Sequence, residues 1–152
     1  MSELLEKARS YEAKKIAATD KESKPLFHIS APAGWINDPN GFSVYNGKIH
    51  LFYQYYPYLR EWGPMHWGHS TTSDMIKWEQ LPCVMAPDEE YDKKGCFSGS
   101  AIEADGKHVL VYTGVTSIKL PDGSEQERQN QCIAFGDGLN YVKYENLSLI
   151  HI

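Results

Sequence analysis

The pattern of hydrophobic and polar positions divides the chain at Pro25. Over residues 2–20, apolar side chains recur near helical spacing, and glycine and proline are absent until Pro25. This pattern predicts a helix over 2–20, in which Leu4, Leu5, Ala8, Tyr11, Lys15 and Ile16 recur near helical spacing. The opposite face carries Glu3, Glu6, Lys7 and Lys14. That charged face is most simply a solvated one, and a docking helix is the alternative.

After Pro25 the pattern changes to short apolar runs separated by turn dipeptides. Residues 41–45 and 48–56 flank Asn46-Gly47, and residues 101–104 and 107–112 flank Asp105-Gly106. These dipeptides favour the tight two-residue turns of β-hairpins. We therefore predict two hairpins and expect the chain beyond residue 25 to be β-structure.

The two predicted hairpins resemble each other. The turn glycines Gly47 and Gly106 are offset by 106 − 47 = 59 residues. A second similarity between the two units relates Asp74 to Asp137, at an offset of 63. A period near 60 with about four strands in each unit is typical of propeller blades. Chance similarity between two common turns is the alternative. Propellers close with about four to eight blades. Two blades therefore predict that the chain is the N-terminal part of a larger propeller.

Composition narrows the class of protein. The 152 residues include 15 Lys and Arg against 20 Asp and Glu, a net charge of −5. This acidic balance predicts no nucleic-acid partner, and no apolar run suggests a membrane span. The start of the chain lacks the apolar core of a signal peptide. Cys83, Cys96 and Cys132 form no Cys-x-x-Cys pair, which favours reduced, buried thiols and a cytoplasmic protein.

The densest candidate chemistry lies in residues 34–41. Pro39 biases Asp38 towards an extended conformation, and Asn40-Gly41 predicts a tight turn immediately after it. We expect the Asp38 side chain to be held at a strand end beside an aromatic ring and an amide. An ordinary turn without a function is the alternative.

Aromatic side chains crowd the region that follows, between Phe52 and Trp67. Aromatic faces with amide and carboxylate neighbours suit a polyhydroxylated sugar ring, and a strand-rich aromatic core is the alternative. His66 and His69 have no evident third ligand, so neither a metal nor another cofactor is expected.

The run Trp35-Ile36-Asn37-Asp38-Pro39-Asn40-Gly41 resembles the signature of glycoside hydrolase family 32, the invertases, sucrose-6-phosphate hydrolases and fructan hydrolases. The resemblance continues through residues 51–55, 63–70, 73–78 and 95–100, in the family's order. It implies an all-β fold, the first two blades or so of a five-bladed β-propeller, preceded by the helix. The implied division is a helical segment at 1–24, blades at 25–146 and an atypical, possibly non-native tail at 147–152.

The resemblance also implies the site and its chemistry. Terminal β-fructofuranosides are cleaved with retention, with Asp38 as the nucleophile. The substrate is sucrose, sucrose-6-phosphate or a fructan, and the implied binding residues are Trp35, Ile36, Asn37, Gln54, Trp62, Phe97 and Ser98. Lys93 and Lys94 are candidates for a phosphate contact, although a solvated basic pair is the simpler interpretation.

The sequence departs from the family after residue 146. The family's Arg-Asp-Pro motif and its acid/base glutamate do not appear, and residues 147–152 are apolar where the family has a polar loop. We therefore expect a truncated or artificially terminated chain that is inactive by itself. A non-catalytic sugar-binding propeller and a transfructosylase remain the alternatives.

Overall fold

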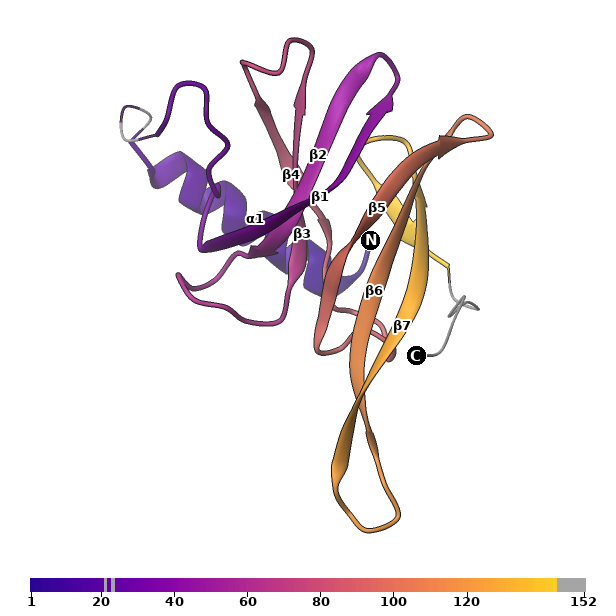
Figure 1. The fold of residues 1–152 in the computed structure, drawn as a ribbon. Helices are drawn as coiled ribbons and strands as arrows, with labels where there is room; N and C mark the ends of the chain where they lie inside the picture. The colour runs from indigo at the N-terminus through magenta and orange to yellow at the C-terminus, as the bar shows by residue number, and fades with distance from the viewer. Residues whose placement is uncertain (21, 23, 145–152) are drawn as a thin grey trace.

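The computed structural model describes residues 1–20, 22 and 24–144, which form one helix and two four-stranded antiparallel sheets (Figure 1). Helix α1 spans Glu3–Ala18. The first sheet contains, in spatial order, β1 (Trp35–Tyr45), β2 (Lys48–Tyr56), β3 (His66–Thr72) and β4 (Glu79–Met85). The second contains β5 (Gly95–Ala104), β6 (Lys107–Lys119), β7 (Glu125–Gly136) and β8 (Tyr141–Lys143). The predicted tail at 147–152 lies outside the described residues.

Both predicted hairpins are confirmed. β1 and β2 are joined by Asn46-Gly47, with φ of 48° and 72°, and β5 and β6 by Asp105-Gly106, with φ of 50° and 72°. Positive φ at both central residues defines the turn whose twist matches that of antiparallel strands. Four strands follow one another in each unit, as the period near 60 residues predicts.

The predicted turn at Asn40-Gly41 is wrong. Strand β1 runs through these residues without reversing direction, and its register with β2 shifts there instead. Gly41 has φ of 57°, and a Cβ built on it would lie 2.6 Å from Cδ2 of Phe52. The glycine is therefore needed for close packing under β1, and the turn signal arose from that backbone requirement.

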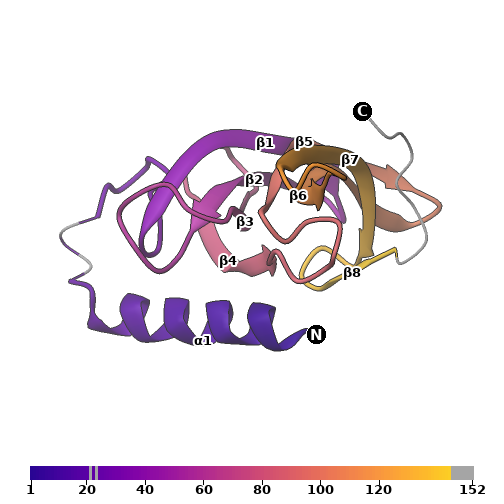
Figure 2. The same ribbon diagram turned by 90° about the horizontal axis from the view of Figure 1, so that it is seen from below.

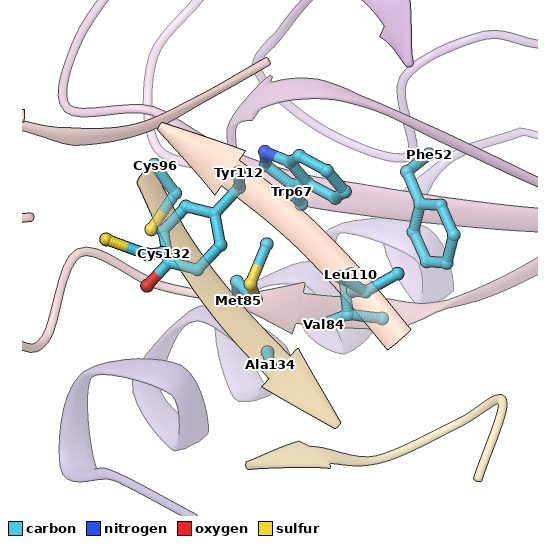
Figure 3. Packing of buried hydrophobic residues seen from close by; sticks show 9 residues of the cluster. All are labelled: Phe52, Trp67, Val84, Met85, Cys96, Leu110, Tyr112, Cys132 and Ala134. Atoms are coloured by element: carbon cyan, nitrogen blue, oxygen red, sulfur yellow. The ribbon is translucent and has the colours of Figure 1, made fainter. Parts of the chain in front are cut away.

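The main core lies between the two sheets. Its side chains come from strands β2 to β7. Figure 3 shows how they pack together: Phe52, Trp67, Val84, Met85, Cys96, Leu110, Tyr112, Cys132 and Ala134. The rings of Trp67 and Tyr112 meet edge to face, with centroids 6.2 Å apart. Cys83, Cys96 and Cys132 are all buried and free, in agreement with the prediction.

A second core lies between α1 and the first sheet, which the helix flanks along one side (Figure 2). Successive side chains of β2 point to opposite faces: Phe52 enters the main core, whereas Tyr53 and Tyr55 face the helix. The second core consists of Leu5, Ala8, Tyr53, Tyr55, Cys83 and Ala86.

The buried face of α1 differs from the predicted one. Leu5 and Ala8 are buried as expected, but Leu4 and Ile16 are 44% and 41% exposed, and Glu12 is buried in their place. Oε2 of Glu12 accepts a hydrogen bond of 3.0 Å from the backbone N–H of Cys83. This polar contact with β4 turns the helix away from the orientation that its apolar residues alone would select.

Arg9 ties the helix to both sheets. Its Nε donates to the carbonyl oxygen of Cys83 at 2.7 Å, at the end of the first sheet. Its Nη1 donates to Oδ1 of Asn140 at 3.0 Å, and its Nη2 to the carbonyl oxygen of Leu139 at 3.2 Å, between β7 and β8. The helix therefore docks within the chain and fixes how the two sheets sit together.

A buried ion cluster joins the last described strand to the connection between the sheets. Nζ of Lys143, on β8, lies 2.5 Å from Oδ1 of Asp88 and 2.6 Å from Oδ2 of Asp92. Asp92 also accepts a hydrogen bond from Tyr112, and Asp88 accepts one from Ser2, the N-cap of α1. We call Lys143, Asp88 and Asp92 the Lys143 cluster.

Three buried histidines meet where the sheets adjoin. Nδ1 of His50 lies 2.9 Å from Nε2 of His69, and the rings of His50 and His108 are 4.8 Å apart. His108 also contacts Ser43 Oγ at 2.9 Å and the Tyr141 hydroxyl at 2.7 Å. Burial lowers the pKa of all three imidazoles, that of His108 to about 4. The histidines are therefore neutral members of the interface at pH 7.

We expect Glu12→Gln to stabilise the protein at pH 8. Burial raises the pKa of Glu12 from 4.5 to about 7, so the folded protein loses stability as Glu12 ionises between about pH 4.5 and about pH 7. The variant should gain about 1–3 kcal/mol at pH 8 and nothing below about pH 4.5. Denaturant unfolding at both pH values measures this. Exposed Glu103→Gln is the control, and an equal gain at both pH values would contradict the assignment.

The histidine interface should weaken in acid. Because the folded-state pKa values lie below the usual 6.5, the unfolded chain binds protons first, and the free energy of unfolding should fall as pH falls from about 6.5 to about 4. His108 alone contributes about 3 kcal/mol across that interval. The measurement is made in the Glu12→Gln background, because the ionisation of Glu12 changes stability in the opposite direction over the same pH range. In that background His108→Gln should flatten the pH dependence of the free energy of unfolding. Exposed His28→Gln should leave it unchanged.

Candidate active site

Matching bulges in β1 and β5 form the foundation of the site. The register of β1 skips Asp38 between Asn37 and Pro39, and the register of β5 skips Ser98 between Phe97 and Gly99. The bulged residues are 98 − 38 = 60 positions apart, which is the period of the sequence repeat. β1 and β5 are also the strands through which the sheets make most contact. Bulges re-aim side chains, and here both point into one pocket.

The pocket has a volume of about 280 Å³ and combines residues from both sheets. Its lining consists of Asn37, Asp38, Gln54, Trp62, Phe97, Ser98, Thr113 and Gln129. The structure thus brings together six of the eight side chains that the sequence singled out. Asp38 is the single ionisable side chain in this lining.

Asp38 is exposed and has φ of 34°, a left-handed conformation that non-glycine residues rarely adopt. Asn40 supports the strained backbone, since its Nδ2 donates to the carbonyl oxygen of Asp38 at 3.2 Å. Strain of this kind persists where the surroundings impose it, and it gathers at functional sites. The bulge presents the carboxylate to the open pocket.

Asn37 is positioned by Trp35. The indole Nε1 of Trp35 donates to Oδ1 of Asn37 at 2.7 Å, which orients the amide so that its NH₂ group is available as a donor. Neither Trp35 nor Ile36 lines the pocket. The side chain of Ile36 packs against the core beneath α1, on the opposite face of β1. The side chain of Ile36 thus serves packing, and that of Trp35 acts through Asn37.

Gln54 forms the floor of the pocket and links the sheets. It is 3% exposed, pairs in register with Asn37, and donates from Nε2 to the carbonyl oxygen of Cys96 at 3.0 Å. That bond uses one of its two N–H groups. The amide oxygen and the other N–H remain to bind a hydroxylated ligand.

Trp62 and Phe97 form the apolar side of the pocket. Their rings meet nearly perpendicular, at 82° with centroids 6.1 Å apart, and Trp62 is 57% exposed. An exposed aromatic face beside fixed polar groups suits the C–H surface of a sugar.

Thr113 and Gln129 are pocket residues that sequence reasoning missed. They lie on β6 and β7, outside the motifs that drew attention. The repeat held the signal for Thr113, because 54 + 59 = 113 makes it the equivalent of Gln54 in the second unit. The predicted second hairpin ended one residue short of it, at Tyr112.

The histidines do not form a metal site with each other. His66 and His69 are three residues apart on β3, so their side chains point to opposite faces. His66 Nδ1 contacts the carbonyl oxygen of Pro64 at 2.9 Å, whereas His69 contacts His50. Over residues 1–20, 22 and 24–144, no group of three or more His, Cys, Asp or Glu side chains could hold a metal ion.

Comparison with known proteins identifies relatives. Residues 28–152 match the Glycosyl hydrolases family 32 N-terminal domain. The chain is 47% identical over 120 residues to a sucrose-6-phosphate hydrolase of Escherichia coli, an alignment that covers 78% of this chain and 25% of that protein. It is 39% identical over 145 residues to a levanase of Bacillus subtilis, covering 93% and 21%.

The solved structures that resemble this chain are of the same kinds of enzyme as the sequence relatives. A β-fructofuranosidase of Bombyx mori superposes with a TM-score of 0.81 and 44% identity, covering 95% of this chain and 31% of that one. A variant of that enzyme has been solved in complex with sucrose. A sucrose-6-phosphate hydrolase of Lactobacillus gasseri gives a TM-score of 0.79 at 33% identity, covering 94% and 29%. The chain spans about a quarter of the length of the curated relatives it matches.

We expect Gln54→Ala to weaken the contact between the sheets. The variant leaves the carbonyl oxygen of Cys96 unpaired, which should lower the free energy of unfolding by about 1–3 kcal/mol. Denaturant unfolding measures the loss. Gln126→Ala, an exposed glutamine on the β6–β7 hairpin, should change stability by less than about 0.5 kcal/mol. Equal effects of the two substitutions would show that Gln54 makes no stabilising link.

Proposed function

The chain belongs to glycoside hydrolase family 32, and we propose that it forms the first part of the catalytic domain of an enzyme that hydrolyses terminal β-fructofuranosides. The observation that carries the proposal is the bulge that presents the Asp38 carboxylate to a pocket of sugar-binding character. Sucrose, sucrose-6-phosphate and fructans are the substrates that the relatives suggest by name.

Asp38 acts as the nucleophile in this proposal. Its carboxylate attacks the anomeric carbon of the fructosyl group and forms a covalent fructosyl-enzyme, which water then hydrolyses. A retaining mechanism needs a second carboxyl group about 5–5.5 Å away to protonate the leaving oxygen. The described pocket lining contains one carboxyl group, that of Asp38. In this proposal the acid therefore belongs to a part of the parent protein that completes the site.

The fructosyl ring is held by the residues around Asp38. Asn37 and Gln54 offer amide groups to its hydroxyls, Ser98 offers a hydroxyl from the opposing bulge, and Trp62 and Phe97 supply the apolar wall. Trp35 positions Asn37. Lys93 pairs with Glu90 at 2.5 Å, which weakens its case as a phosphate contact.

The two sheets are the first blades of a five-bladed propeller in this proposal, after a helical segment at 1–24. Their matching four-strand order, the 60-residue offset of their bulges and the similarity to longer fructofuranosidases support the arrangement. The second sheet exposes Ile102 by 60% and Val142 by 74%, and further blades would cover such positions. No helix in the described part of the chain is long and apolar enough to cross a membrane. Three buried, free cysteines suit a reducing compartment, and on that ground we propose that the protein acts in the cytoplasm.

Asp38→Asn should abolish turnover by the complete protein without unfolding it. The substitution is nearly isosteric but removes the attacking anion, so kcat on sucrose should fall on the order of 10⁴-fold. Fructose release measures the effect, and product analysis separates hydrolysis from transfer to another sugar. Asp105→Asn is the matched control, because Asp105 also has a left-handed backbone but lies in a remote turn. Full activity of Asp38→Asn would refute the nucleophile.

A further inference from the structure

The pocket has a second polar wall that the motif residues do not explain. We propose that Thr113, oriented by Gln131, and Gln129 bind the hydroxyl groups of the departing sugar and so select the leaving group. This inference rests on the proposed function, and it assigns a role to β6 and β7 that no motif carries.

The internal repeat places Thr113 where the first sheet has Gln54. Asn37 pairs with Gln54 immediately before the bulge at Asp38, and Phe97 pairs with Thr113 immediately before the bulge at Ser98. The pocket is therefore built from two equivalent halves that meet along β1 and β5. Gln54 is the polar group of the first half, and Thr113 is its counterpart in the second.

Hydrogen bonds within the second sheet leave suitable groups free. Nε2 of Gln131 donates to Oγ1 of Thr113 at 2.8 Å, which leaves the Thr113 hydroxyl hydrogen as a donor. Nε2 of Gln129 donates to Oε1 of Glu127 at 3.0 Å, which leaves the Gln129 amide oxygen as an acceptor. A donor and an acceptor on adjacent strands suit the hydroxyls of a sugar ring.

The position of these groups points to the departing sugar rather than to the fructosyl ring. β5 packs against β1, whereas β6 and β7 lie one and two strands further out, at about 5 Å per strand. Gln54 on the floor is 3% exposed, whereas Thr113 and Gln129 are only half-buried. A nucleophile attacks opposite the bond that breaks, so the departing sugar lies on the side of the anomeric carbon away from Asp38. In this proposal the outer wall contacts it there.

The surrounding fold supports the same placement. Gln129 lies at the base of the β6–β7 arm, residues 116–128, which projects beyond the rest of the molecule in Figure 1. The register of the arm is continuous from Thr113 to Lys119. The arm is therefore a continuous extension of the strands that carry the outer wall.

Two substrates with different leaving groups test the proposal in the complete protein. Sucrose loses a hexose, whereas 4-nitrophenyl β-D-fructofuranoside loses a phenol without sugar hydroxyls. Thr113→Val and Gln129→Ala should each lower kcat/KM on sucrose about tenfold, the effect of one lost hydrogen bond, and change it less than about twofold on the aryl substrate. Thr113→Ser, which keeps the hydroxyl, should restore activity on sucrose.

Thr116→Val is the matched control, because it makes the same change on β6 outside the pocket lining. Thermal melting confirms that each variant folds. Equal losses on both substrates, or no loss on either, from both Thr113→Val and Gln129→Ala would overturn the assignment while leaving the proposed function intact. A wild-type protein that cleaves neither substrate would overturn the proposed function and this assignment with it.

Discussion

The buried ammonium of Lys143 is the interaction on which the rest of the arrangement depends. It pairs with both Asp88 and Asp92, which lie in the connection between the sheets, and it does so from the last described strand. Removing one partner from a buried pair leaves a charge uncompensated, which costs about 3–5 kcal/mol. Through Ser2 and Tyr112 the same carboxylates also hold the start of α1 and the centre of β6. The Lys143 cluster therefore connects helix α1, the segment between the sheets and the second sheet.

The site follows from this arrangement because its two halves come from different sheets. Cys96 lies beside the Lys143 cluster, with its Sγ 3.7 Å from the ammonium, and its carbonyl oxygen receives the hydrogen bond from Gln54. The next residues, Phe97 and Ser98, enter the pocket. A short path of covalent and hydrogen bonds thus connects the buried charges to the wall that faces Asp38. The wall that faces Asp38 is thus positioned by contacts far from Asp38 in the sequence, whereas Asn40 supports the strained backbone of Asp38 locally.

Local chemistry made part of this structure predictable. Asn46-Gly47 and Asp105-Gly106 specify their turns through backbone conformations that few residues tolerate. The motif around Asp38 supplied two of the eight residues that line the pocket. The buried face of α1 was not predictable, because Glu12 is fixed by a backbone N–H on β4, 71 residues away. Asn40-Gly41 was misinterpreted for a related reason, since the ring of Phe52 on a neighbouring strand demands the glycine. Thr113 escaped attention because a lone threonine in a strand belongs to no motif, and only the repeat relates it to Gln54.

The β6–β7 arm gives the protein a way to diversify. Its tip is closed by local hydrogen bonds, among them Leu120 N–H to the Ser124 carbonyl and Ser124 N–H to Asp122. Its residues belong to neither of the two hydrophobic cores. Inserting residues in pairs at such a tip preserves the inward and outward alternation of both strands. Descendants of this sequence could therefore lengthen or recharge the arm while Asp38 and Gln54 stay where they are. Evolutionary change at the tip of the arm is thereby separated from the constraints on the pocket around Asp38.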